Sequence, residues 1–116
     1  MNDFLLLMHN DAVDSQLAND AVAWQRYFAL LQQSGSFAGG SEIGAGCCFR
    51  REVPQCGEMQ LGSAKQQTVR PQASSDHLTG FIRLRVESMA AAEAFLSGNP
   101  VYEAGGTVEI RELPRD

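Results

Sequence analysis

Residues 78–114 read LTGFIRLRVESMAAAEAFLSGNPVYEAGGTVEIRELP, and this stretch predicts a strand, a helix and a second strand. In residues 81–86, apolar side chains at Ile82, Leu84 and Val86 alternate with arginines, which is the period of a strand with one buried face. Residues 107–113 alternate in the same way, with Val108 and Ile110 on one side. The stretch therefore predicts one half of a split β-α-β fold.

The segment between these two strands carries the signals of a helix. Ser88 offers a side-chain oxygen to the free amides of a helix start, and residues 89–96 are rich in the good helix formers Ala, Glu and Leu. Gly98 can adopt the left-handed conformation that ends a helix, and Pro100 cannot continue one. We therefore expect a helix over residues 89–96 and a loop after it.

The first part of the chain predicts another strand and helix. Residues 3–9 are apolar on both alternating sides, which is typical of a strand in the middle of a sheet. A helix out to residue 34 is predicted by an apolar stripe, which Tyr27 and Leu30 widen. Asp14 or Ser15 is expected to cap its start, and Gly35 its end. The residues of the stripe are Leu17, Ala21, Trp24, Phe28 and Leu31.

Residues 36–76 combine a glycine-rich strand with a long insertion. The run SFAGGSEIGAGCC at residues 36–48 predicts a bent strand, and it is not followed by the Gly-Lys-Ser/Thr of a phosphate-binding loop. Residues 49–76 predict a hairpin or long excursion, with a strand at residues 65–70.

The composition excludes two classes of partner. The chain has 116 residues, with nine Lys and Arg against 14 Asp and Glu, so it lacks the basic surface that nucleic acids require. No apolar run approaches the ~18–20 residues of a membrane-spanning helix, and residues 4–8 are too short for a signal peptide. The three cysteines are therefore expected to be reduced thiols of a cytoplasmic protein.

The order of the predicted elements indicates an α+β fold, a ferredoxin-like βαββαβ domain with an antiparallel sheet and an extra hairpin or loop insertion between strands 2 and 3. Two helices cover one face of such a sheet. The other face carries Leu5, Leu7 and Phe81, an apolar patch that soluble monomers rarely expose. We therefore expect a homodimer in which the two sheets pack face to face.

Several segments, taken in order, are similar to those of a known family. They are FLLLMHND at residues 4–11, a helix ending at Gly35, the Gly39-Gly40 pair, LTGF at residues 78–81, and NPVYEAGG and VEIR at residues 99–106 and 108–111. With them the chain resembles the YCII-related family, which includes the DGPF proteins, within the dimeric α+β barrel group. The resemblance implies one domain over residues 1–116. The Asp-Gly-Pro-Phe tetrapeptide is missing, and the likeness fails at residues 49–76.

The resemblance also implies a class of activity. Some members are thought to be small enzymes that act on lactones or chlorinated aromatic rings, with a His and an Asp near the pocket. In this chain Trp24 stands where the helix histidine is expected, and Asn99 stands where an Asp often precedes Pro100. Both departures remove a titrating group, so this chemistry would need other residues here.

His9 and Asp11 are the candidate catalytic residues. A histidine whose ring is oriented by a carboxylate can act as a general base near neutral pH, and strand geometry puts both side chains on one side if the strand extends that far. The alternative is a solvated strand-end histidine beside a turn-forming Asp.

Five further residues are candidates for ligand binding. Arg83 can bind a carboxylate or an oxyanion, or else, like Arg85, form a cross-strand ion pair with Glu109. Aromatic residues in the first helix either touch a pocket or belong to the core, and residues in the loop after the second helix either bind a ligand or cap the helix end. These residues are Trp24 and Tyr27 in the helix, and Asn99 and Tyr102 in the loop.

The sequence predicts neither a cofactor nor a metal. Cys47, Cys48 and Cys56 lack a CxxC pair, and adjacent cysteines rarely share one tetrahedral ion. We therefore interpret them as structural or incidental thiols. Haem stays open as an alternative, since His9 has the chemistry of an axial ligand.

Three functional hypotheses follow. The first is a cofactor-independent isomerase or lyase that acts on a small anionic or aromatic ring compound, with His9 as base, Asp11 as its orienting group and Arg83 as the stabiliser of an anion or enolate. The second is a non-catalytic dimer that binds a small ligand or a protein. The third is an oxygen- or haem-using enzyme.

Overall fold

The computed structural model describes residues 1–47, 49–51, 67–68 and 75–114, and it divides the chain into two compact units. The first unit comprises residues 1–43 and 77–116, and the second comprises residues 44–76. In the second unit, the described strands β3 (Phe49–Arg50) and β4 (Gln67–Thr68) pair antiparallel. The strand predicted over residues 65–70 is thus confirmed at its centre, and its remaining residues lie outside the described part of the chain.

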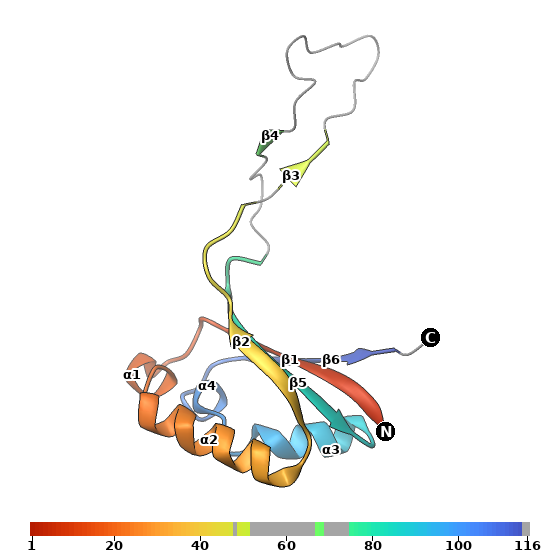
Figure 1. The fold of residues 1–116 in the computed structure, drawn as a ribbon. Coiled ribbons are helices and arrows are strands. Elements are labelled where there is room, and N and C mark those ends of the chain that lie inside the picture. The colour runs from red at the N-terminus through yellow and green to blue at the C-terminus, as the bar shows by residue number, and fades with distance from the viewer. Residues whose placement is uncertain (48, 52–66, 69–74, 115–116) are drawn as a thin grey trace. The chain divides into compact units, whose positions relative to one another are not determined.

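The first unit contains an antiparallel sheet of four strands (Figure 1). These are β1 (Asn2–His9), β2 (Phe37–Glu42), β5 (Leu78–Val86) and β6 (Val108–Leu113), in the order β2-β5-β1-β6. This order, with a β3–β4 hairpin inserted between β2 and β5, confirms the predicted ferredoxin-like fold.

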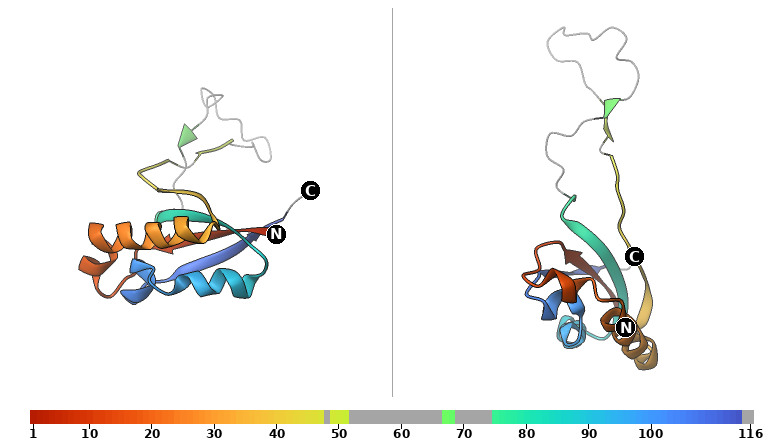
Figure 2. Two further views of the ribbon diagram at one scale, coloured as in Figure 1. Left: turned by 60° about the horizontal axis from the view of Figure 1, so that its bottom comes forward. Right: turned by 90° about the vertical axis from the view of Figure 1, so that its left-hand side faces the viewer.

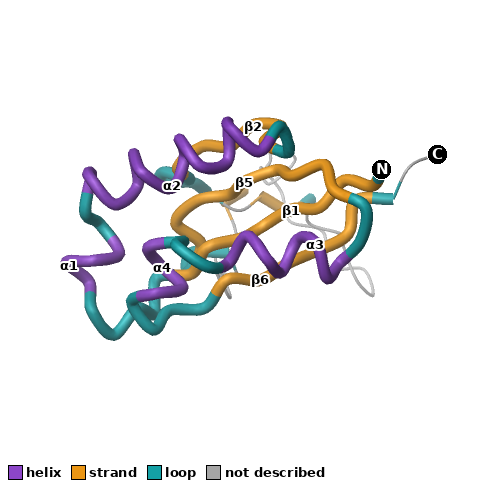
Figure 3. Tube along the Cα trace, turned by 90° about the horizontal axis from the view of Figure 1, so that it is seen from below, coloured by secondary structure: helices purple, strands orange, loops and turns teal. Residues whose placement is uncertain are grey.

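Helices cover one face of this sheet, as the view from the helix side and the two turned views show (Figures 2 and 3). The single first helix that the sequence predicts is two helices, α1 (Ser15–Ala18) and α2 (Ala21–Ser34). The break arises because Asp20 accepts a hydrogen bond from the Val22 amide at 3.0 Å and starts a new helix. Gly35, with a φ of 77°, ends α2 as predicted.

The second helical segment also has two parts. α3 (Met89–Glu93) begins at the predicted cap Ser88 and continues into the 3-10 helix η1 (Ala94–Leu96). The predicted loop after it is wrong in one respect, since Pro100 opens a further helix, α4 (Pro100–Glu103). Proline is well suited to the first helical position, where no amide is needed for an intrahelical hydrogen bond.

The core lies between the helices and one face of the sheet. The side chains of Leu6, Ile82 and Leu84 on the sheet, together with Leu31 of α2, are 0% exposed. Leu30, which the spacing placed on the buried stripe, is 50% exposed, because α2 turns Tyr27 and Leu31 toward the core instead. The other buried members of this core are Phe4, Met8, Val86, Ala92 and Val101.

The opposite face of the sheet carries the alternate residues of the same strands. Leu7 lies directly across from Phe81 on one side and Glu109 on the other, and Leu5 lies between Arg83 and Arg111. Since paired residues of an antiparallel sheet point to the same face, this face mixes apolar and charged side chains. It is the face that the helices leave uncovered, since α2 and α3 lie on the other side of the sheet (Figure 1).

Candidate functional site

A cavity of about 440 Å³ lies where the ends of β1, β2 and β5 meet helices α1 and α2. Three aromatic residues, Trp24, Phe28 and Phe81, are among those that line it. Its polar wall includes His9, Asn10, Ser41, Glu42 and Thr79. Mixed walls of this kind, mostly apolar with a few polar groups, are typical of sites for small molecules.

Gly80 of β5 lies in the wall of this cavity, in close contact with β2. It is buried, it lies opposite Met8, and it lines the cavity without a side chain of its own. A Cβ atom at this position would lie 3.2 Å from the Ser41 carbonyl oxygen and 3.4 Å from the Met8 Cε atom. The strand pairing shifts its register between Met8 and His9, next to this glycine. A closely packed glycine in β5 and an irregular end of β1 therefore mark this corner of the sheet.

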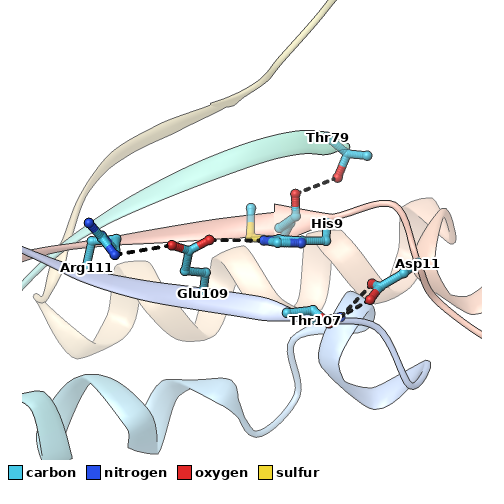
Figure 4. A network of polar contacts seen from close by, with 7 residues as sticks. His9, Asp11, Thr79, Thr107, Glu109 and Arg111 are labelled. Atoms are coloured by element: carbon cyan, nitrogen blue, oxygen red, sulfur yellow. Dashed lines mark hydrogen bonds and ion pairs between the residues drawn. The ribbon is translucent and has the colours of Figure 1, made fainter. Parts of the chain in front are cut away.

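His9, the last residue of β1, is held by a carboxylate. Its Nε2 atom lies 3.2 Å from Oε1 of Glu109, and its side chain is 19% exposed (Figure 4). Arg111 in turn places Nη1 3.6 Å from Oε2 of the same Glu109. A hydrogen bond from Nε2 to the carboxylate leaves Nδ1 as the nitrogen available for proton exchange. The pair has the arrangement of a general base and the group that orients it.

Asp11 does not orient His9, contrary to the prediction. Its Oδ1 atom accepts a hydrogen bond from the Thr107 amide at 2.8 Å, and its Oδ2 atom accepts one from the Thr107 hydroxyl at 2.6 Å (Figure 4). The hydroxyl and amide of Thr107 lower the pKa of Asp11 below its usual value, and His9 contributes a smaller effect. Asp11 therefore links the chain after β1 to the start of β6.

His77 lies beside the candidate base. The centroids of the His9 and His77 rings are 4.5 Å apart, and the rings are tilted by 59°. The His77 carbonyl accepts a hydrogen bond from the Asn10 amide at 2.8 Å, which keeps the segment before β5 next to the end of β1. The exposed His77 ring thus shields one side of His9 from solvent.

Trp24 and Tyr27 of α2 are one helical turn apart, with ring centroids 6.0 Å apart, but they line different cavities. Trp24 lines the cavity, and its indole nitrogen donates a 2.7 Å hydrogen bond to the Ala18 carbonyl. Tyr27 is buried in the core, and its hydroxyl donates to the Phe95 carbonyl at 2.6 Å. Burial raises the Tyr27 pKa, and a hydrogen bond with Asn99 partly offsets this effect. Tyr27 does not line the 440 Å³ cavity; it lines a second cavity, of about 280 Å³, between α2 and α4.

Asn99 and Tyr102 lie away from the larger cavity. Asn99 is 0% exposed, and its Oδ1 atom accepts hydrogen bonds from the amides of Val101 at 2.9 Å and Tyr102 at 3.1 Å. Of the two interpretations that the sequence left open, the structure shows capping, at the start of α4 rather than at the end of the preceding helix. Tyr102 is 48% exposed and does not line the larger cavity.

Arg83 and Arg85 pair with Asp3, so the ion pair that the sequence placed at Glu109 is wrong. The Arg83 Nη2 atom lies 3.2 Å from Asp3 Oδ2, and the Arg85 Nε atom lies 2.9 Å from Asp3 Oδ1. The Asp3 hydrogen bond raises the pKa of Arg85. Asp3 lies across from Arg85 on the neighbouring strand, and this register brings the charges together. Arg83 does not line the cavity.

The cysteines and acidic residues form no metal site in the part of the chain that the structure describes. Cys47 is an exposed free thiol, and Cys48 and Cys56 lie outside the described residues. Within that same part, no helix has the length and apolar character needed to span a bilayer.

Glu109 and Gly80 are the site residues that the sequence did not reveal. Glu109 is 100 positions from His9, and the two meet because Leu7 pairs with Glu109 in the register of β1 and β6. The alternation of residues 107–113 puts Glu109 on the face opposite Val108, which was the available signal. The pairing of β1 with β6 makes His9 the partner of Glu109, and local periodicity does not reveal which strands pair.

Comparison with known proteins supports the fold. No family model matches the sequence, and no curated protein does. The structure is similar to that of 5-chloro-2-hydroxyhydroquinone dehydrochlorinase from Burkholderia phenoliruptrix AC1100, solved in complex with 2,5-dihydroxybenzoquinone. The TM-score is 0.54 at 14% sequence identity, over 98% of this chain and 95% of the other. At this identity the likeness concerns the fold.

Proposed function

We propose that this chain binds a small ring compound in the 440 Å³ cavity and that His9 acts on it as a general base. The observation that carries the proposal is His9, which lines a cavity that three aromatic residues also line and whose Nε2 atom lies 3.2 Å from Glu109. The similarity in fold to a dehydrochlorinase solved with a quinone ligand supports this ligand class.

The chemistry of the pair is proton transfer. With Glu109 accepting from Nε2, the Nδ1 atom of His9 removes a proton from a hydroxyl or from a carbon next to a carbonyl, and the carboxylate stabilises the imidazolium that forms. The same ring then returns the proton to another atom in an isomerisation, or a leaving group departs in an elimination. The reaction is that of a cofactor-independent isomerase or lyase.

Filling the cavity tests the binding site directly. Replacing Gly80 with Val puts a branched side chain at the cavity wall, against the Ser41 carbonyl and Met8, so we expect ligand affinity to fall at least tenfold. Trp24 is the chain's only tryptophan and lines the cavity, so its fluorescence reports binding of hydroquinone.

The control for this variant is Ala38→Val, which places the same valine side chain at an exposed residue of β2 outside the cavity. It is expected to bind as wild type does. Circular dichroism checks that both variants fold. Equal affinity in wild type and a folded Gly80→Val variant would place the ligand elsewhere and end the proposal.

The proposal includes a homodimer and membership of the YCII-related family. The support for a dimer is the sheet face that the helices leave uncovered, where Leu5, Leu7 and Phe81 lie beside charged side chains. A second sheet packed on this face would enclose Arg83 and Arg85, which both bind Asp3, in a chamber between the two sheets. In that chamber Arg83 would bind a ligand. We expect light scattering at micromolar concentration to give twice the 12.6 kDa mass of one chain. Leu7→Arg is expected to give the mass of one chain, and a monomeric wild type would exclude the chamber.

A second candidate is a non-catalytic binding protein. Two observations favour it, since Trp24 and Asn99 stand where the family resemblance implies titrating groups and both have structural hydrogen bonds here. Loss of turnover on replacing His9, with ligand affinity unchanged, would exclude this candidate. Ligand binding by wild type and by the His9 variant, without turnover by either, would favour it.

A further inference from the structure

The charged residues that line the cavity differ from those expected of a site that binds anions. Among its lining residues, all of which are described, Glu42 is a carboxylate and His9 is a titratable ring, while neither a lysine nor an arginine belongs to the wall. A second carboxylate, that of Glu109, places its Oε1 atom 3.2 Å from Nε2 of His9. A ligand in this cavity therefore meets acidic groups before it meets a fixed cation.

Three arginines of the sheet are paired with carboxylates. Arg83 and Arg85 share Asp3, at 3.2 and 2.9 Å, and Arg111 lies 3.6 Å from Glu109. All three are on strands, with registers that fix which carboxylate each one faces. An anion in the cavity would thus lose part of its hydration and face Glu42 without a charge partner in the wall, which is unfavourable.

Glu42 is placed where its carboxylate would repel a negatively charged ligand. It is the last residue of β2 and lies across from Gly80, which also lines the cavity. Paired residues of an antiparallel sheet point to the same face, so the Glu42 side chain leaves the sheet on the face to which a side chain at Gly80 would point. The polar residues Ser41, Thr79 and Asn10 line the same cavity, and residues of this type suit the hydroxyl or carbonyl groups of an uncharged ring.

We infer that the cavity selects uncharged ring compounds over anionic ones and that Glu42 is the residue that sets this preference. The inference rests on the proposed function, since it concerns the ligand of the same cavity. It replaces the anionic ring compound of the sequence-based hypothesis with a neutral one that carries hydroxyl or carbonyl groups.

The test compares two probes that differ by one carboxylate, hydroquinone and 2,5-dihydroxybenzoate. Calorimetric titration under anaerobic conditions at pH 8 keeps histidine side chains in the range where they are ordinarily uncharged. We expect hydroquinone to bind wild type at least tenfold more tightly than 2,5-dihydroxybenzoate. Glu42→Gln should shrink this ratio to about threefold or less, mainly by improving binding of the carboxylate. Glu112→Gln, which removes the same charge from an exposed residue of β6 outside the cavity, should leave the ratio unchanged.

The outcomes separate the two proposals. Equal or tighter binding of 2,5-dihydroxybenzoate by wild type would overturn the inference and leave the cavity as a ligand site. A ratio that Glu42→Gln leaves unchanged, or that Glu112→Gln reduces equally, would also overturn it, because the preference would not come from Glu42. If wild type binds neither probe, the proposed function fails, and this inference fails with it.

Discussion

Replacing His9 with Asn lowers kcat by about 10²–10⁴-fold for any ring compound that the protein turns over, the range typical of a lost general base. The reason is that Asn can hydrogen-bond to Glu109 but cannot take a proton from the substrate. The effect should fall on kcat more than on KM, since the ring is one of several groups that line the cavity. Steady-state kinetics with the purified variant measures both.

Two carboxylate variants distinguish the geometry in the structure from the one that the sequence suggested. Glu109→Gln removes the charge 3.2 Å from His9 and is expected to lower kcat to a value between those of wild type and His9→Asn. Asp11→Asn changes a carboxylate that is hydrogen-bonded to Thr107, so its kcat is expected to stay near wild type. A large loss in Asp11→Asn together with normal turnover by Glu109→Gln would reverse the roles given to these two residues.

Replacing Leu6 with Ala destabilises the fold by about 2–5 kcal/mol, the usual cost of truncating a leucine in a closely packed core. Leu6 is 0% exposed and sits in the middle of β1, between Ile82 on β5 and Ile110 on β6. Loss of the leucine side chain leaves a cavity that both neighbouring strands border. Urea denaturation followed by circular dichroism gives the free energy of unfolding.

Leu7→Ala is the matched control, because it removes the same atoms from the next residue, on the uncovered face of the sheet. In a monomer it should cost less than Leu6→Ala. In the proposed dimer its cost grows with protein concentration, because association then stabilises the wild-type fold more than the variant. An equal cost for both variants, independent of concentration, would contradict the assignment of the two faces.

The fold was predictable because the strands keep a simple alternation and the helices carry recognisable caps. Ile82, Leu84 and Val86 all face the core, and Ser88 and Gly35 cap the helices as the sequence predicts. The break before α2 was missed because Asp20 interrupts a stripe whose apolar spacing continues on both sides of it. Local periodicity is insensitive to one residue that caps a new helix.

The site was predictable only in part, because it depends on contacts between distant segments. The sequence singles out His9 by its chemistry, but its partner Glu109 follows from the pairing of β1 with β6. The nearby Asp11 was the reasonable choice from sequence, and Thr107 takes its carboxylate instead. Neither strand register nor the space beside Gly80 can be obtained from the chemistry of the residues alone.

The central claim is that a small ring compound occupies the cavity beside His9. Its most direct test is an NMR titration of the isotope-labelled protein with hydroquinone, following the backbone amides, the Trp24 indole and the His9 ring. The account predicts saturable shifts concentrated at Trp24, His9 and Gly80, with the resonances of Leu30 and Tyr102 unchanged. Saturable shifts that do not include the resonances of Trp24, His9 and Gly80 would contradict it. The absence of any shift at millimolar hydroquinone would also contradict it.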